Sequence, residues 1–150
     1  MIKNILLITL PLLLISCYST RHINANDKLL KENTITINNQ RNIRVKGVSK
    51  KEINAIIKQK PNKNILGFIP FHMWIYNLSN SKKNNWINSY LRKIGEKPII
   101  IDSILIEKSV SQIKSYFENN GYFTSKVTSR TNYKKQKGYV NYNIETGESY

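Results

Sequence analysis

Hydrophobic and polar positions form their most regular pattern in residues 98–150, where they predict a long helix followed by two strands. From Ser103 onward, apolar residues recur at intervals of three and four positions, as they do along one face of a helix. Asp102 can accept hydrogen bonds from the free amides of a first turn, and Gly121 tolerates the left-handed conformation that closes a last turn. The pattern therefore predicts a helix between these two residues, with a buried face formed by Ile106, Val110, Ile113 and Phe117.

Two alternating segments after this helix predict a β-hairpin. The first extends from Tyr122 to about Tyr133, and the second follows a polar turn over residues 134–138. One side of the first segment has Phe123, Ser125 and Val127, and the other side has Thr124, Lys126, Thr128 and Arg130. The apolar side of the second segment has Val140, Tyr142 and Ile144. Each strand therefore has one face for a core and one face for water.

The upstream residues supply a further strand and a further helix, which a helix and a hairpin need before they can enclose a core. Residues 31–38 alternate between apolar and polar side chains and predict the strand. Ser49 and Glu52 have the spacing of a capping box at a helix start, and Pro61 disfavours helical geometry in the residue before it. The predicted order is strand, helix, insert over residues 61–98, helix, strand, strand. This is an α+β fold, with a three-stranded sheet covered on one face by two helices.

The insert concentrates apolar and aromatic side chains between basic ones, and three interpretations of it stay open. In the first, Trp74 and Tyr76 belong to an extra layer of core, and a short helix packs against it through Trp86, Tyr90, Leu91 and Ile94. In the second, aromatic rings lie at the headgroup level of a membrane and lysines contact the phosphates. In the third, the same surface binds a partner protein. The residues predicted for membrane or partner contact are Trp74, Tyr76, Lys82 and Lys83.

The N-terminus has the pattern of a bacterial lipoprotein signal, with Lys3, an apolar segment over residues 5–15, and a cysteine at the cleavage site. About 20 apolar residues are needed to cross a bilayer. The shorter segment here, which Pro11 interrupts, therefore predicts a cleaved signal peptide over residues 1–16 rather than a retained transmembrane anchor.

Cys17 is the only cysteine in the sequence, which excludes a disulfide within the chain and leaves its place beside the signal as the informative fact. It is the predicted lipid attachment site, where diacylglycerol and an amide-linked acyl chain such as palmitate would form a lasting membrane anchor. Because Tyr18 rather than Asp follows it, we expect sorting to the outer membrane, facing the periplasm. Residues 17–27 are polar and without period, as in a flexible tether.

The formal net charge of +15 raises the question of an anionic partner. Lys, Asn and Ile make up 62 of the 150 residues, a bias typical of an AT-rich genome, so much of the charge follows from composition. Proteins that read nucleic acids favour arginine for bidentate contacts with bases, and this chain has five arginines. We therefore expect no nucleic-acid partner, whereas contact with anionic lipid or lipopolysaccharide phosphates stays open.

Side chains with catalytic or metal-binding chemistry are few and dispersed. His22 and His72 lie far apart in the sequence, Cys17 is assigned to the lipid, and the nine carboxylates have no spacing that indicates an acid–base pair. The sequence contains no recognisable nucleophile motif and no glycine-rich phosphate loop. We therefore expect no catalytic residues, no metal, no cofactor and no enzymatic activity.

Two patterns near the C-terminus resemble the second half of a POTRA domain, the periplasmic module that precedes the β-barrel in outer-membrane assembly proteins of the BamA and TamA type. These patterns are Gly121-Tyr122-Phe123 and Val140-x-Tyr142-x-Ile144-x-x-Gly147-x-x-Tyr150. Three upstream runs are similar to the first such domain in a lipidated branch of that family found in Bacteroidetes-type bacteria: residues 60–68, 74–80 and 86–98. The resemblance extends over residues 29–150. It departs from the family at Ser149, where proline is expected, and in a longer polar stretch over residues 38–47.

The resemblance implies that residues 28–146 form one POTRA-like domain and that residues 147–150 begin a link to a next repeat. In the family, an edge strand of the sheet accepts an extended partner by strand addition. That edge would be the strand over residues 122–133, with binding residues Thr124, Lys126, Thr128 and Arg130. The partners would be unfolded outer-membrane proteins or a protein of the assembly machinery, and the chain would be part of a longer, barrel-containing protein.

Two other functions stay open. The main alternative is a stand-alone envelope lipoprotein with a structural or anionic-lipid-contacting role, which would suit a naturally short chain. The other is a lipoprotein that binds a solute or a polysaccharide, for which the sequence indicates no concave aromatic site.

Overall fold

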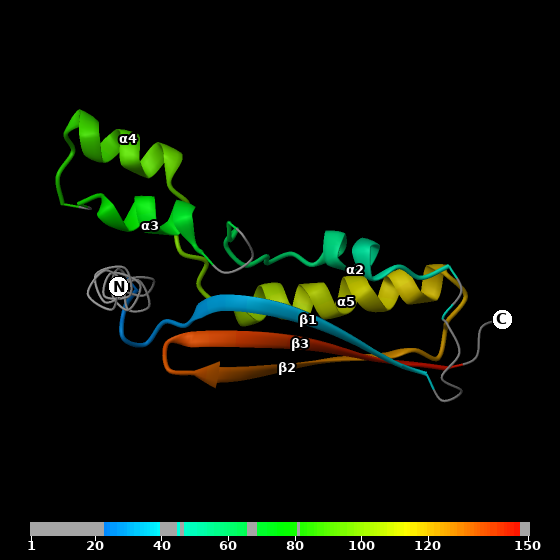
Figure 1. The fold of residues 1–150 in the computed structure, drawn as a ribbon. Coiled ribbons are helices and arrows are strands. Elements are labelled where there is room, and N and C mark those ends of the chain that lie inside the picture. The colour runs from blue at the N-terminus through cyan, green and yellow to red at the C-terminus, as the bar shows by residue number, and fades with distance from the viewer. Residues whose placement is uncertain (1–22, 40–44, 46, 66–68, 81, 148–150) are drawn as a thin grey trace, which may run out of the picture. The chain divides into compact units, whose positions relative to one another are not determined.

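The chain forms an α+β fold, as predicted, built from three strands and four helices in the part of the chain that the structure describes (Figure 1). The computed structural model describes residues 23–39, 45, 47–65, 69–80 and 82–147. In chain order the elements are β1 (Leu29–Asn39), α2 (Lys50–Ile56), α3 (Phe71–Leu78), α4 (Trp86–Ile94), α5 (Ser103–Asn119), β2 (Lys126–Lys134) and β3 (Lys137–Thr146). They fall into two compact units. The sheet unit comprises residues 30–61 and 99–147, and the hairpin unit comprises residues 62–98 together with the described N-terminal residues up to Leu29.

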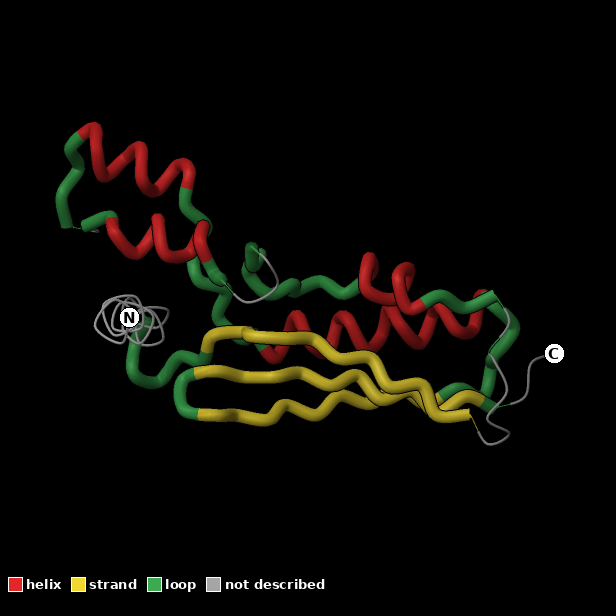
Figure 2. The backbone as a smooth tube through the Cα atoms, viewed as in Figure 1, coloured by secondary structure: helices red, strands yellow, loops and turns green. Residues whose placement is uncertain are grey.

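The three strands form one mixed sheet in the order β1-β3-β2, with β3 in the centre (Figure 2). β2 and β3 are antiparallel, with a continuous register from the Lys126–Glu145 pair to the Lys134–Lys137 pair. β1 runs parallel to β3 (Figure 1). Strands β1 and β2 are therefore the two edges of the sheet.

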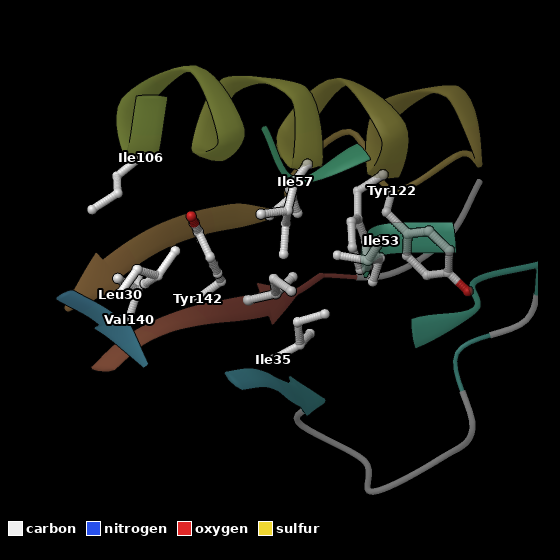
Figure 3. Packing of buried hydrophobic residues seen from close by; sticks show 11 residues of the cluster. Leu30, Ile35, Ile53, Ile57, Ile106, Tyr122, Val140 and Tyr142 are labelled. Carbon is white, nitrogen blue, oxygen red and sulfur yellow. The ribbon is translucent and has the colours of Figure 1, made fainter. Parts of the chain in front are cut away.

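The core of the sheet unit lies between α2, α5 and one face of the sheet (Figures 1 and 3). The predicted apolar face of α5 is confirmed, because Ile113 and Phe117 are fully buried and Val110 is partly buried against the same cluster. Full burial of a large apolar side chain contributes about 1.5–3 kcal/mol, so this cluster is the main source of stability. Its members are Leu30, Ile35, Ile53, Ile57, Ile106, Ile113, Phe117, Tyr122, Val140, Tyr142 and Ile144.

Helix α5 begins and ends where its caps predict. Asp102 Oδ1 accepts from the amides of Ile104 and Leu105 at 2.8 and 3.3 Å, and the helix starts at the next residue. At the other end, Gly121 has a φ of 86°, which is in the left-handed region that glycine adopts at low cost. The end of the helix is also held by the Tyr122 amide, which donates to Phe117 O at 3.0 Å.

The start of α2 differs from the predicted capping box. The Ser49 hydroxyl accepts from the Lys51 amide at 3.2 Å, as an N-cap does, but the Glu52 carboxylate accepts from the Tyr116 hydroxyl. That hydroxyl oxygen accepts from the Ser49 amide at 3.2 Å, so Tyr116 of α5 occupies the place expected for the carboxylate. Partial burial, with help from the hydrogen bond to Glu52, raises the pKa of the Tyr116 phenol. The cap therefore joins α2 to α5, which the local sequence spacing does not reveal.

The strand expected from Tyr122 begins later, at Lys126. Residues 121–125 form a turn in which the Ser125 amide donates to Tyr122 O at 3.2 Å. In this turn Tyr122 and Ser125 are buried, whereas Phe123 is 62% exposed. The prediction that Phe123 faces the core is wrong, because strand alternation does not apply to residues that are not extended. Strand β1, in contrast, is longer than the predicted residues 31–38.

The predicted insert contains two helices, α3 and α4 (Figure 2). The sequence predicts α4, and α3 was not foreseen. A Cβ built on Gly95, at the end of α4, would lie 2.5 Å from Tyr76 N, so the two helices approach each other at a distance that glycine permits. The buried side chains of this unit include four polar ones, Asn62, Asn77, Ser79 and Asn88, beside the apolar Leu29 and Met73.

Some predictions concern residues outside the described part of the chain. The signal peptide over residues 1–16, the lipid site Cys17, and residues 148–150 of the expected link belong to this group, as do residues 40–44 of the polar stretch. Among the helices that the structure describes, none has the length and apolar character needed to cross a membrane.

Candidate functional site

The candidate site is the outer edge of β2, an exposed strand of nine residues. The turn to β3 has two residues rather than the predicted five, because Lys134 pairs with Lys137. A pair that flanks a two-residue turn exchanges both hydrogen bonds, and such pairs alternate with non-hydrogen-bonded pairs along an antiparallel ladder. Every second residue of β2 therefore directs its N–H and C=O away from β3. These residues are Val127, Ser129, Thr131 and Tyr133.

The opposite edge, at β1, is partly covered. The Leu30 amide donates to Ile99 O at 2.8 Å, so the segment that leads into α5 lies along the start of this strand. Gln59 holds that segment in place, because its side chain donates to Ile100 O at 2.5 Å and accepts from the Asp102 amide at 3.1 Å. Over the described residues, no other segment pairs with the outer edge of β2. Of the two edges, β2 is therefore the one open along its length to an incoming strand.

Three of the four predicted edge residues, Lys126, Thr128 and Arg130, lie on β2 with exposed side chains. They belong to the hydrogen-bonded pairs, so their backbone groups point toward β3 and their side chains are what they offer a partner. The fourth, Thr124, is outside the strand, in the turn before it, where its side chain lies against the backbone of Gly147. The site therefore consists of outward N–H and C=O groups at the odd-numbered residues of β2 and exposed polar side chains at its even-numbered residues.

The face of the sheet opposite the helices is polar. Thr36 Oγ1 and Asn141 Oδ1 are 3.1 Å apart, and Asn38 Nδ2 donates to Asn143 Oδ1 at 2.9 Å, which connects β1 and β3 across this face. Arg130 is paired with Asn141, and residues directly opposite each other point to the same face of a sheet. The exposed cations of β2 therefore lie on this polar face, beside the open edge.

The end of β2 next to the turn is held by a close cross-strand contact. Tyr133 is opposite Gly138, where an added Cβ would lie 3.3 Å from the Tyr133 ring and would overlap the side chain of Ile101. Lys135, the first residue of the turn, has a φ of 57°, a left-handed conformation that residues other than Gly, Asn and Asp adopt at some cost. The strand is thus paired up to its last residue, and the open edge extends as far as the turn.

The residues predicted for membrane or partner contact lie in the hairpin unit. Trp74 is 41% exposed on α3, where its ring stacks on that of Phe71 with centroids 5.9 Å apart. Lys82 and Lys83 are exposed in the loop between α3 and α4. Tyr76 is half-buried, because the end of α4 packs against its backbone. Three of the four side chains are therefore available at the surface of this unit, and Tyr76 contributes mainly to its packing.

The interpretation of the insert as extra core is wrong for its largest side chains. Trp86 is 79% exposed and Tyr90 is 59% exposed, both on α4. Asn88 is buried on the other side of the same helix. On α4 the buried side chain is therefore polar and the large aromatic side chains are exposed, a reversal of the usual amphipathic arrangement.

Side chains that could bind a metal ion do not gather in the described ranges. Among those residues, no group of three or more His, Cys, Asp or Glu side chains is placed to hold a metal ion. His72 packs edge-on against Phe71, with ring centroids 5.9 Å apart, and its carbonyl accepts from the Glu96 amide at 3.0 Å. His22 lies outside the described residues.

Sequence reasoning missed the residues whose backbone forms the open edge. Their identity depends on the length of the turn between the strands, and the polar run over residues 134–138 does not show where a two-residue turn falls. The strict alternation of Val140, Tyr142 and Ile144 is the signal that could have located this turn. These side chains face the core, and the residues of β2 that pair with them must face the same side of the sheet, which limits the possible registers.

Two comparisons with known proteins complete the description of the site. Residues 35–147 match the POTRA family, described as a surface antigen variable number repeat. The match spans well over half of the chain and includes all of β2 and β3. A search of curated proteins gave no match.

Proposed function

The chain belongs to the POTRA family, and on this premise we propose that it binds extended segments of unfolded outer-membrane proteins by strand addition to β2. POTRA domains are periplasmic polypeptide-binding modules associated with outer-membrane protein assembly, and they act as binding or scaffold modules rather than as enzymes. The finer assignment to assembly proteins of the BamA and TamA type, in their lipidated branch, is part of this proposal.

The observation that supports strand addition is the open edge of β2 in Figure 2. Four residues direct N–H and C=O groups outward at the spacing of a β-ladder, from Val127 to Tyr133. A main-chain ladder gives affinity with little dependence on the partner's sequence, as a module with many unfolded clients requires. Lys126 and Arg130 beside this edge would attract acidic segments, and such charges also limit edge-to-edge aggregation between copies.

We further propose that Cys17 bears a lipid that holds the module at the periplasmic face of the outer membrane. The basic residue, apolar segment and cysteine at the start of the sequence support this anchor. Residues 18–28 separate the cysteine from β1, and residues 24–27 among them form a turn in which the Asp27 amide donates to Asn24 O at 3.0 Å. The segment can therefore span less than the roughly 35–40 Å of a fully extended chain of that length. Such a tether would let the sheet unit reach clients near the membrane surface. A stand-alone envelope lipoprotein remains the alternative function.

Proline at Ser129 tests strand addition most directly. Ser129 is exposed and directs its amide away from β3, so Ser129→Pro removes one outward donor without removing a hydrogen bond to β3 or a core side chain. The measurement is photocrosslinking of a labelled, unfolded β-barrel peptide to the full chain. We expect the crosslink to fall at least about tenfold, since a lost ladder position disrupts the pairing of its neighbours as well.

Ser129→Ala is the matched control, because it removes the same side chain and retains the amide. It should crosslink as the unmodified protein does. Circular dichroism and urea unfolding must show that both variants are folded. A second control, Lys126→Glu with Arg130→Glu, should reduce the crosslink mainly at low salt, where screening is weak. If Ser129→Pro crosslinks normally while the charge variant does not, the binding is electrostatic and strand addition is excluded.

The anchor has its own test. Cys17→Ser should abolish incorporation of radiolabelled palmitate and release the protein from membranes on washing with high salt. Unchanged incorporation would exclude Cys17 as the lipid site. Because this measurement does not involve β2, it stands apart from the crosslinking result.

A further inference from the structure

Helix α4 presents its apolar side outward. Successive residues of a helix are separated by about 100° around its axis, so four of its side chains fall within an arc of roughly 100°. All four are among the exposed large apolar residues of the protein, and Trp86 is the most exposed of them. They are Trp86, Ile87, Tyr90 and Ile94. A stripe of this kind on a surface helix normally marks the face that another surface covers.

The polar side of α4 is turned inward and is firmly held. Asn88 is buried, and its Oδ1 accepts from the Asn80 amide at 2.7 Å. Arg92 donates to Asn80 O at 3.1 Å and to Asn84 Oδ1 at 2.8 Å. These bonds tie α4 to the loop that precedes it. The apolar stripe is therefore fixed outward by hydrogen bonds on the opposite side, and a simple rotation of the helix would break them.

Helix α3 has a similar exposed stripe. Phe71, Trp74 and Leu78 follow the spacing of one helix face, and each has at least two-fifths of its surface exposed. The rings of Phe71 and Trp74 stack on each other, which keeps both at the surface. Tryptophan and tyrosine rings are the side chains that favour the boundary between lipid tails and headgroups.

The charge of the hairpin unit is mainly positive. Residues 62–98 contain one acidic residue, Glu96, whose carboxylate accepts from the Lys63 amide at 3.1 Å, and six basic residues, which are Lys63, Lys82, Lys83, Arg92, Lys93 and Lys97. Lys82, Lys83 and Lys93 are exposed, and within the described residues they form no ion pair. A protein partner for such a surface would need to be both apolar and acidic. A membrane with anionic headgroups offers both properties at once, since its phosphates lie directly above its acyl chains.

We propose that the hairpin unit binds the headgroup region of an anionic phospholipid membrane, with the apolar stripe of α4 inserted among the headgroups and Lys82, Lys83 and Lys93 on the phosphates. This contact is independent of strand addition at β2, because it uses another unit of the protein. A membrane-bound hairpin unit would keep the protein at the lipid surface by two attachments, a surface contact and the proposed anchor.

Trp74 and Trp86 are the two tryptophans of the chain, so single-tryptophan variants report each helix separately. The experiment uses the full chain with Trp74→Phe, mixed with vesicles of phosphatidylcholine containing 30% phosphatidylglycerol and lipids brominated near the headgroup. We expect a blue shift of Trp86 emission and strong quenching by the bromines. Vesicles of phosphatidylcholine alone should give weak quenching. A lipid or leader elsewhere in the chain would attach the protein to both kinds of vesicle, so the difference between them reports the contact of α4 itself.

Lys82→Gln with Lys83→Gln should lower the quenching of Trp86 on anionic vesicles, with about a fivefold weaker surface contact expected for each lysine removed. The matched control is Lys134→Gln with Lys135→Gln, which removes the same charge at the β2–β3 turn and should leave the quenching unchanged. If Trp86 is neither shifted nor quenched, or if both double variants lose quenching equally, the proposal is wrong. A blue shift that needs no vesicles and grows with protein concentration would also overturn it, in favour of self-association.

Discussion

The two units of this protein differ in which side chains they bury and which they expose. The sheet unit places its large apolar residues inside, around Phe117 and Tyr142, and leaves one polar face and one open edge to water. The hairpin unit places asparagines inside and its tryptophans outside. The first arrangement lowers the free energy of the isolated chain, whereas the second lowers it only when something covers the outside. The difference separates a unit built for stability from one built for contact.

The largest expected effect lies in the sheet unit. Phe117→Ala removes a fully buried ring, and the cavity that it leaves should cost about 3–5 kcal/mol of unfolding free energy. A domain whose whole stability is about 5–15 kcal/mol would be close to unfolding. Urea denaturation followed by far-ultraviolet circular dichroism measures the change.

Lys114→Ala is the control on the same helix. Lys114 is exposed and forms an i, i+4 ion pair with Glu118 at 3.7 Å, which contributes little at a surface. Its loss should change the unfolding free energy by less than about 0.5 kcal/mol. Equal effects of the two substitutions would mean that α5 does not bury the face assigned to it.

A smaller and local effect is expected in the hairpin unit. Gly95→Ala adds a methyl group 2.5–2.7 Å from the backbone N and Cα and the Cβ of Tyr76, so the helices must separate, at a cost of about 1–3 kcal/mol. Amide hydrogen exchange should become faster in α3 and α4 and stay unchanged in β3. Ser89→Ala, at an exposed position of α4, should leave amide exchange unchanged in α3, α4 and β3. Faster exchange in β3 as well would show that the two units unfold together and would weaken the comparison.

The smallest effect on the unfolding free energy is expected for Trp86, the large apolar side chain with the greatest exposed fraction. Trp86→Ala removes an indole that is 79% exposed, so the unfolding free energy should change by less than about 0.5 kcal/mol, a small fraction of the loss at Phe117. Thermal unfolding of the two variants side by side gives the comparison directly. A loss above 2 kcal/mol would mean that Trp86 packs in a core, and the distinction between the units would fail at that residue.

The sheet unit could be predicted from the sequence almost entirely, because its patterns are local and mutually consistent. The apolar period of α5, the caps at Asp102 and Gly121, and the alternation of β3 each identify one element and one face. Two of the details that escaped this reasoning lie at the ends of elements. The turn over residues 121–125 ends the alternation early, and Tyr116 replaces Glu52 at the cap of α2 through a contact between distant parts of the sequence.

The candidate site was predictable only in part. That β2 is an edge follows from the family resemblance, but which backbone groups point outward depends on a turn whose length the residues do not specify. In the hairpin unit, hydrophobicity alone would place Trp86 inside and Asn88 outside. The structure reverses both, since Asn88 has partners within the unit that the sequence does not reveal.

Two hydrogen bonds, one on each side of the junction between the units, show how the chain passes from one unit to the other. Within the sheet unit, Gln59 is bonded to Ile100, and within the hairpin unit, Asn62 Nδ2 donates to Lys97 O at 2.8 Å. The chain therefore leaves and re-enters the sheet unit at neighbouring points, as it does where one module has been inserted into a surface loop of another. Closing that loop with a few residues instead of the insert would alter the closure entropy by only a few kcal/mol at most. A short loop between Pro61 and Ile99 should therefore leave the contacts of the sheet unit in place, which makes α3 and α4 a separable part of the protein.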